Sequence, residues 1–293
     1  MKPRVSVCMI SYNHEAFIRQ SIESILAQDT DFDFELVIGD DCSIDGTAAI
    51  CEEFALRDSR VRLLPREANL GVMPNFTRTL RACEGEYIAI CEGDDYWTDP
   101  QKLRKQVQFL DTHADYAGSA HQSTIIIDGI TVRRFKEQVP ADLSTSDLIG
   151  GRLFHTASVM FRRNALDLFC NAPQVLSCDR LLNICISILG RIRYSDESMC
   201  AYRLHGAGMS SMVTVEQLKL DLNCIPYLKR ISPAFPRYRY TSYVFATIGL
   251  YKKSGLLQKI YYLALSILYS FSYFPSNVSI GLKLMRKKLL DRD

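Results

Sequence analysis

The sequence predicts an α/β protein with a mostly parallel central sheet, followed by a helical C-terminal region. Three observations predict this fold class. From residue 4 to about 113, short apolar segments that suit strands alternate with segments whose apolar residues recur at helical spacing. Beyond residue 114 strand and helix patterns are mixed, and from about Val215 onward the pattern is helical. Alternating strands and helices favour a parallel sheet that helices cover on both faces.

The expected elements follow one another along the chain. Strands are predicted at residues 5–10, 36–38, 61–64 and 87–91, and later at 123–127, 158–161 and 192–194. Asn13 is expected to cap the first helix, and Pro74 to open the third helix at its first position. Other helices are expected after Asp45, after Asp99 and over residues 180–189.

Composition limits the class of protein. The chain has 293 residues, of which 47% are hydrophobic and 23% charged, so it can bury a full core. A net charge of +2 argues against a nucleic-acid partner. The ten cysteines form no CxxC pair and no dense framework, so most are expected to be reduced core residues. No apolar signal-peptide segment follows residues 1–4, so a cytoplasmic location is expected.

The longest apolar stretch, residues 260–274, contains no charged residue but is shorter than the roughly 20 residues of a membrane-spanning helix. It is rich in Tyr and Leu, and basic residues lie nearby at 252–253 and 286–288. Such a helix suits a headgroup layer, so residues 240–293 are a candidate for peripheral contact with the inner face of a membrane. Packing on the domain, or on a second subunit of a homo-oligomer, is an equal alternative.

Two pairs of adjacent acids follow predicted strands. Asp40 and Asp41 follow the second strand, and Asp94 and Asp95 follow the fourth. Neighbouring carboxylates repel each other, and such a pair is stable mainly when a divalent cation neutralises it. Ligands bind at the carboxyl ends of the strands in an open parallel sheet, so both pairs are expected to meet residues 11–13 in one crevice. Neither GxGxxG nor GxxxxGK[ST] is present, which leaves a nucleotide held through carboxylates and metal.

Several motifs, taken in order, carry a resemblance to a known family. They are VSVCMISYN at 5–13, SIESILAQ at 21–28, VIGDDCSIDGT at 37–47, NLG at 69–71 and GEYIAICEGDD at 85–95. Together they resemble family 2 glycosyltransferases, which are inverting enzymes with a GT-A fold. Residues 202–205, followed by Ser210, are similar to a further motif of that family. The resemblance covers roughly the first 115 residues.

We expect a GT-A domain at residues 1–213, and the helical pattern predicts a separate C-terminal region at 214–293. Within the domain, residues 1–113 would form the nucleotide-binding half, and residues 114–213 would form the half that faces the acceptor. The implied donor is a nucleotide sugar, most simply a UDP-sugar.

The resemblance also implies roles for individual residues of the first half. Tyr12 would stack on the base and Asp41 would hydrogen-bond it. Asp94 would hold the ribose, and Asp95 would bind the Mg²⁺ or Mn²⁺ that bridges the diphosphate. Asp40 would either contact the nucleotide or only fix the turn.

Three later residues complete the predicted site. His205 could add a nitrogen ligand, which would favour Mn²⁺ over Mg²⁺, and Arg203 could pair with a phosphate. Asp179 matches the position at which relatives carry their catalytic acid, so it is the candidate general base. A plain N-terminal helix acid is the alternative for Asp179, and a solvated loop histidine is the alternative for His205.

These expectations amount to a metal-dependent, inverting glycosyltransferase. It would move a sugar from a nucleotide-sugar donor to a hydroxyl of a glycan or lipid-linked acceptor in cell-surface polysaccharide synthesis. One alternative is a nucleotidyltransferase of similar fold, although such enzymes carry a glycine-rich basic loop that residues 11–15 do not match. The other is a catalytically idle protein that binds nucleotide sugars.

Overall fold

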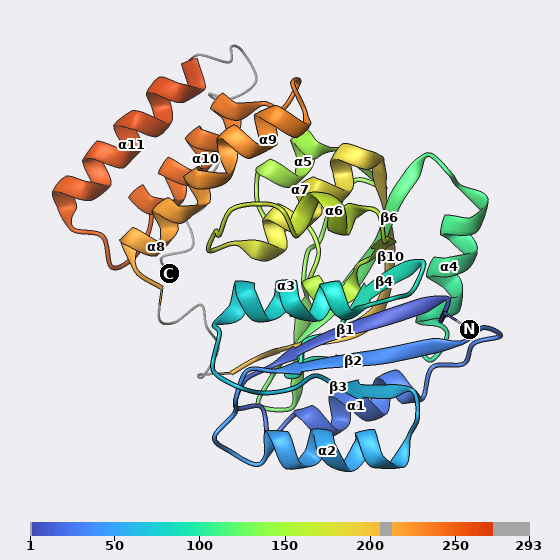
Figure 1. The fold of residues 1–293 in the computed structure, drawn as a ribbon. Helices are drawn as coiled ribbons and strands as arrows, with labels where there is room; N and C mark the ends of the chain where they lie inside the picture. Colours follow the sequence, from blue (N-terminus) through green and yellow to red (C-terminus); the bar gives the residue numbers. More distant parts are fainter. Residues whose placement is uncertain (1, 206–212, 272–293) are drawn as a thin grey trace. The chain divides into compact units, whose positions relative to one another are not determined.

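The computed structural model describes residues 2–205 and 213–271, and these residues form two compact units (Figure 1). The described part of the first unit comprises residues 2–144, 152–171 and 182–205. The described part of the second unit comprises residues 145–151, 172–181 and 213–271. The predicted boundary at residue 213 stays a prediction, because the second unit also takes in two short segments from earlier in the chain.

The first unit is built on one sheet, which has ten strands among the described residues. Their order is β3-β2-β1-β4-β9-β6-β10-β5, with β7 beside β6 and β8 beside β10. The strands are β1 Val5–Ser11, β2 Phe34–Asp40, β3 Val61–Leu63, β4 Tyr87–Ile90, β5 Tyr96–Trp97, β6 Tyr116–Ile127, β7 Ile130–Arg134, β8 Asp142–Leu143, β9 Met160–Arg162 and β10 Arg191–Leu204. The pairs β3–β2, β2–β1, β1–β4 and β6–β10 are parallel. Strand β9 lies between β4 and β6 and runs antiparallel to both.

Helices cover both faces of the parallel part of this sheet. Figure 1 shows α1 and α2 on one face and α3 on the other. The helices of this unit are α1 Ile18–Leu26, α2 Thr47–Arg57, α3 Val72–Ala82, α4 Lys102–Thr112, the 3₁₀ turn η1 Thr156–Ser158 and α6 Ala165–Phe169. Since both faces are covered, the central strands carry almost unbroken apolar runs, and every residue of β4 is buried.

The second unit is helical. Its elements are α5 Thr145–Ile149, the first turn of α7 Cys178–Leu189, α8 Val215–Lys219, the 3₁₀ turn η3 Leu220–Cys224, α9 Ile225–Ile231, α10 Arg237–Gly249 and α11 Leu256–Phe271. Among the residues that the structure describes, none of the helices combines the length and apolar character needed to cross a bilayer. The part of the predicted membrane contact at residues 272–293 lies outside the described residues.

The predicted fold class is confirmed, with local corrections. Asn13 does not cap α1, which begins at Ile18; it lies in the left-handed region with φ of 56°. Pro74 is the third residue of α3 rather than its first. β10 is much longer than the predicted strand at 192–194, because its far half pairs with β6 across register shifts. All ten cysteines are free, and most of them are buried, as expected.

Lys102, the first residue of α4, is fully buried. The Lys102 ammonium donates to Gln106 Oε1 at 2.7 Å and lies 4.2 Å from the centre of the Trp97 ring. Gln106 in turn donates to the carbonyls of Ser119 and Ser158. Complete burial of Lys102 lowers its pKa from 10.5 to about 8, because the charged form loses its hydration.

This shift predicts a pH-dependent contribution to stability. Between about pH 8 and 10.5 the unfolded chain holds a proton on Lys102 that the folded chain has released, so its contribution to the free energy of unfolding rises with pH. Lys102→Met should therefore stabilise the protein most below pH 8, and that advantage should shrink by up to about 3 kcal/mol by pH 10.5. Urea unfolding across this pH range measures the difference.

Lys105→Met is the matched control on the same helix. Asp99 and Glu197 raise the pKa of Lys105, so its removal should not produce a gain that fades with rising pH. A Lys102→Met advantage that stays constant over this range would contradict the lowered pKa.

Candidate active site

The predicted acids lie together at the carboxyl ends of the parallel strands. Asp40 is aligned with Ser11 across the β1–β2 pair, and the backbone N–H of Asp41 donates to the Ser11 carbonyl at 2.9 Å. The turn after β4 is tied to the same edge, because Gly93 N–H donates to the Ile10 carbonyl at 3.0 Å. Three loops from distant parts of the sequence therefore converge, as the strand order predicted.

Asp94 faces two histidines. Its Oδ2 lies 3.1 Å from His205 Nε2 and 3.7 Å from His14 Nε2. About a fifth of the side chain of Asp94 is exposed, and each imidazole is 17% exposed, so a ligand can reach the group. A carboxylate and two imidazoles are ligand types that suit a first-row divalent cation, although the centres of the two rings lie 6.3 Å apart.

His14 was not predicted as a site residue. Its Nδ1 is buried and has no hydrogen-bond partner, while its backbone N–H donates to Thr47 Oγ1 at 2.8 Å. Burial lowers the pKa of His14, and the charge of Asp94 opposes that effect. Gly93 leaves room for the ring, because a Cβ there would lie 3.0 Å from His14 Nδ1. The signal in the sequence was a histidine directly after residues 11–13, combined with a glycine before Asp94.

Asp95 points the other way, into the protein. Only 1% of Asp95 is exposed; Oδ1 accepts the backbone N–H of Arg203 at 3.0 Å, and Oδ2 lies 3.4 Å from His155 Nε2. Burial raises its pKa, the charges of Asp94 and Glu92 raise it further, and Arg203 opposes them. His205 contacts Asp94 rather than Asp95, and the role of Asp95 and His205 as metal ligands stays a prediction.

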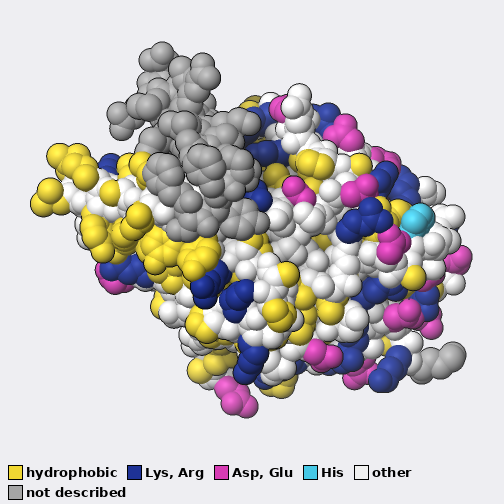
Figure 2. All heavy atoms as spheres, turned by 90° about the horizontal axis from the view of Figure 1, so that it is seen from above, with side chains coloured by type: hydrophobic (Ala, Val, Ile, Leu, Met, Phe, Trp, Pro, Cys, Tyr) yellow, Lys and Arg dark blue, Asp and Glu magenta, His cyan; other side chains and the backbone are white. Residues whose placement is uncertain are grey.

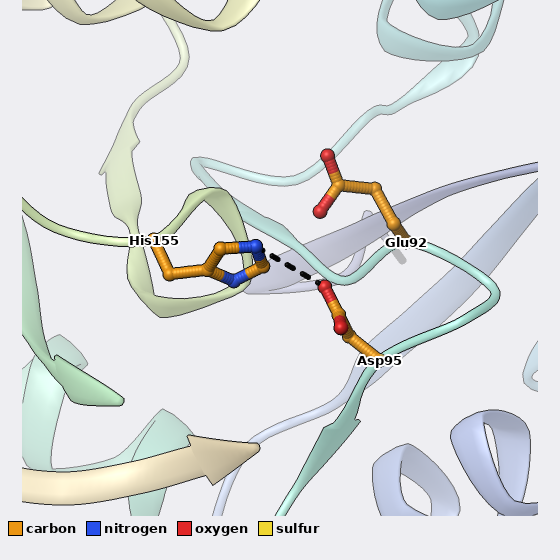
Figure 3. A group of neighbouring side chains, drawn as sticks. All are labelled: Glu92, Asp95 and His155. Carbon is orange, nitrogen blue, oxygen red and sulfur yellow. Dashed lines mark ion pairs between the residues drawn. The ribbon is translucent and has the colours of Figure 1, made fainter. Parts of the chain in front are cut away.

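Figure 3 shows a second group that could hold a cation, made by Glu92, Asp95 and His155. One potential ligand atom from each lies within 4.8 Å of the others. However, the Ala157 N–H donates to His155 Nδ1 at 3.3 Å, so the ring proton is on Nε2 and points toward Asp95. Burial lowers the pKa of His155 well below its usual value, which agrees with a neutral ring in this tautomer. This arrangement suits a buried hydrogen bond better than a metal ligand.

The two acids after β2 organise loops. Asp40 is fully buried, and its carboxylate accepts hydrogen bonds from the backbone N–H of Ser43 at 3.1 Å and from the Ser43 hydroxyl. It also forms an ion pair with Arg66 at 3.4 Å. This geometry supports the turn-fixing alternative for Asp40. Asp41 accepts the backbone N–H groups of Leu70 at 2.7 Å and Gly71 at 2.9 Å, and thereby shapes the loop before α3. The contact of Asp41 with a base stays a prediction.

Tyr12 lies on the rim of the same edge. It is 46% exposed, which leaves ring surface for stacking. The next residue, Asn13, links the β1 and β2 loops: its N–H donates to Ser43 Oγ and its Oδ1 accepts the N–H of Ile44, both at 2.9 Å. The rim is thus held by hydrogen bonds between loops.

Arg203 is engaged by the protein itself. Its Nη1 donates to the Asp94 carbonyl at 2.6 Å, its Nη2 donates to Gln20, and its guanidinium lies 4.3 Å from the centre of the Tyr96 ring. Burial lowers its pKa below the usual value. The geometry therefore gives Arg203 a clamping role on the Asp94 turn, and its predicted contact with a phosphate stays a prediction.

Asp179 belongs to the second unit, in the first turn of α7. The segment before it is anchored by the buried Asp221, which accepts the backbone N–H groups of Leu176 and Ser177, both at 2.9 Å. Asp221 also accepts the Ser177 hydroxyl at 2.7 Å and pairs with Arg180 at 3.4 Å. Asp221 fixes the turn that carries Asp179, whose role as base stays a prediction.

Structural comparison reveals similar folds. S. aureus TarS 1–349 in complex with UDP-GlcNAc superposes with a TM-score of 0.70 and 20% identity, over 90% of this chain and 79% of that one. The mannosyltransferase PcManGT from Pyrobaculum calidifontis, in complex with GDP-Man and Mn²⁺, gives a TM-score of 0.59 and 18% identity, over 100% and 89%. At these identities the likeness concerns the fold, and it confirms the predicted GT-A architecture.

Sequence comparison gives the family. The chain is 39% identical over 209 residues to an uncharacterized protein of Mycobacterium tuberculosis (strain ATCC 25618 / H37Rv), covering 70% of this chain and 60% of that protein. It is 31% identical over 160 residues to the succinoglycan biosynthesis protein ExoO of Rhizobium meliloti (strain 1021), covering 55% and 44%. The chain thus spans at most about 60% of these two relatives. The sequence profile "Glycosyl transferase family 2" matches residues 6–168, more than half of the chain, so the chain belongs to glycosyl transferase family 2.

Proposed function

We propose that this protein is an inverting glycosyltransferase that transfers a sugar from a nucleotide-sugar donor, a UDP-sugar, to a hydroxyl group. The acceptor in this proposal is a glycan or lipid-linked intermediate of polysaccharide synthesis. Family membership supports sugar transfer, and the name of the relative ExoO supports a polysaccharide product. The nucleotide sugars bound by TarS and PcManGT, which share the fold, support the donor class.

The observation that carries the proposal is the cluster of Asp94, His205 and His14. A carboxylate oxygen and two nearby imidazole nitrogens are ligand types for a divalent cation, and nitrogen donors favour Mn²⁺ over Mg²⁺. A cation bound there would neutralise the charge that develops on a departing nucleoside diphosphate. In this proposal Asp94 takes the metal-binding role first given to Asp95, and His14 joins His205.

The remaining residues bind the donor and move a proton. Tyr12 stacks on the base at the rim, and the β2 loop that Asp41 holds contacts its edge. A sugar hydroxyl is a poor nucleophile near neutral pH, so an inverting enzyme needs a base opposite the leaving group. Asp179 accepts that proton in this proposal, and Asp221 keeps its turn in place.

The metal site is tested by Asp94→Asn. Removing the charged oxygen between the two imidazoles should weaken Mn²⁺-dependent UDP binding at least about tenfold. Isothermal titration with UDP, with and without Mn²⁺, measures this. Asp128→Asn, in the exposed turn between β6 and β7, is the matched control and should bind like the wild type.

Two histidine variants separate the two candidate cation sites. His14→Gln should lower Mn²⁺ affinity, whereas His155→Gln should leave it within about twofold if the protein stays folded by circular dichroism. The opposite result would move the cation to Glu92, Asp95 and His155. Wild-type Mn²⁺ affinity in Asp94→Asn would refute the proposed site altogether.

The general base is tested by Asp179→Asn. Transfer should fall by about 10²–10⁴-fold, because the acceptor hydroxyl keeps its proton, while UDP and Mn²⁺ affinity should not change. A panel of nucleotide sugars assayed for diphosphate release provides the measurement. Asp167→Asn, an exposed first-turn acid of α6, serves as control. Normal turnover by Asp179→Asn would remove Asp179 from the mechanism.

A further inference from the structure

Helix α11 exposes a row of large apolar side chains, which is unusual for a helix on a protein surface in water. Its outward face carries large apolar side chains that are 45–83% exposed. They are Leu256, Leu257, Ile260, Tyr261, Ile267 and Leu268. The spacing of these residues places them on one side of the helix, together with the exposed Ala264. We call this set the α11 apolar face.

The opposite side of α11 packs on α10 through aromatic rings, with Tyr262 and Tyr269 against Phe245, and through buried serines. Ser242 on α10 donates to the Ser266 carbonyl, and Ser266 donates to the Ser242 carbonyl, both at 2.9 Å. Ser242 also contacts Ser270 at 2.8 Å. Gly249 allows close approach, because a Cβ there would lie 2.8 Å from Leu263. Buried hydroxyls that hydrogen-bond between helices, with large apolar residues facing outward, also occur in helices that contact lipid.

The charge around this helix pair fits an anionic partner. Between residues 222 and 290 the sequence contains eleven Lys and Arg residues and no Asp or Glu. Lys252 and Lys253 lie directly before α11 and are exposed, and Lys259 lies within it. Figure 2 shows the apolar side chains gathered at the left of the view, where Figure 1 places α11, with Lys and Arg next to them. A positive margin around an apolar face suits the surface of an anionic bilayer.

The length of α11 decides how it could meet a bilayer. Its 16 residues span about 24 Å, which is shorter than a hydrocarbon core of about 30 Å. We propose that the α10–α11 helix pair is a membrane-binding device that lies in the plane of an anionic lipid surface, with the α11 apolar face in the acyl boundary and Lys252 and Lys253 at the headgroups. This inference is independent of the proposed sugar transfer.

Flotation of the full chain with lipid vesicles tests the inference. The wild type should float with vesicles of phosphatidylglycerol and phosphatidylcholine at least about tenfold better than with pure phosphatidylcholine, and added salt should weaken the binding. Leu257→Glu combined with Ile260→Glu and Leu268→Glu should lower flotation at least about tenfold with both kinds of vesicle. Lys252→Gln with Lys253→Gln should mainly remove the preference for phosphatidylglycerol.

Controls keep the result distinct from misfolding and from catalysis. Leu56→Glu, at an 89% exposed position on α2, should float like the wild type. Asp94→Asn should also float normally, and the triple α11 variant should keep its Mn²⁺-dependent UDP binding. Circular dichroism checks that the triple variant is folded.

Three results would overturn the inference. The first is failure of the wild type to float with anionic vesicles, and the second is a folded triple variant that floats as well as the wild type. The third is that light scattering finds the wild type to be a dimer and the triple variant a monomer, while both float equally well. That result would make the α11 apolar face a contact between copies of the chain.

Discussion

The site depends on two adjacent carboxylates being forced into opposite environments. Arg203 at the end of β10 does this: its backbone N–H holds the Asp95 side chain inward, and its guanidinium holds the Asp94 carbonyl. The Asp95 side chain points into the protein, whereas the Asp94 side chain points toward His205 and His14. Repulsion between neighbouring acids is reduced because each carboxylate has its own donors. The same contacts tie β10 to the β4 turn, so fold and site share one set of interactions.

The sequence was sufficient to predict the parallel strands and to predict that the loops after them meet at one edge of the sheet. Those strands are buried on both faces, so their apolar runs were readable, and their carboxyl ends had to share an edge. It was not sufficient to distinguish Asp94 from Asp95. Which of the two points inward is decided by Arg203 and His155, more than fifty residues away in the sequence. His14 was missed for the same reason, since only the folded chain brings it to Asp94.

The proposed base illustrates a different limit. A first-turn acid such as Asp179 can be nominated from a motif, but its alternative as an ordinary helix acid has the same sequence pattern. What the structure adds is the buried Asp221, which satisfies two backbone N–H groups and a hydroxyl just before α7. A buried carboxylate that accepts three neutral donors from one turn holds that turn rigidly. Nothing near residue 221 in the sequence signals this, because the contact joins segments about forty residues apart.

The exposed apolar side chains of the C-terminal helices are explained if lipid, rather than water, surrounds them. In water, exposing large apolar side chains such as Leu257 forgoes part of the hydrophobic driving force for packing. In lipid the outward apolar residues carry no such penalty, and the interhelical hydrogen bonds have no water to compete with. The sequence showed a short uncharged stretch beside basic residues, which left membrane contact and protein packing equal. The structure favours lipid because it shows that large apolar side chains of α11 are exposed beside exposed lysines, rather than packed against the described part of the chain.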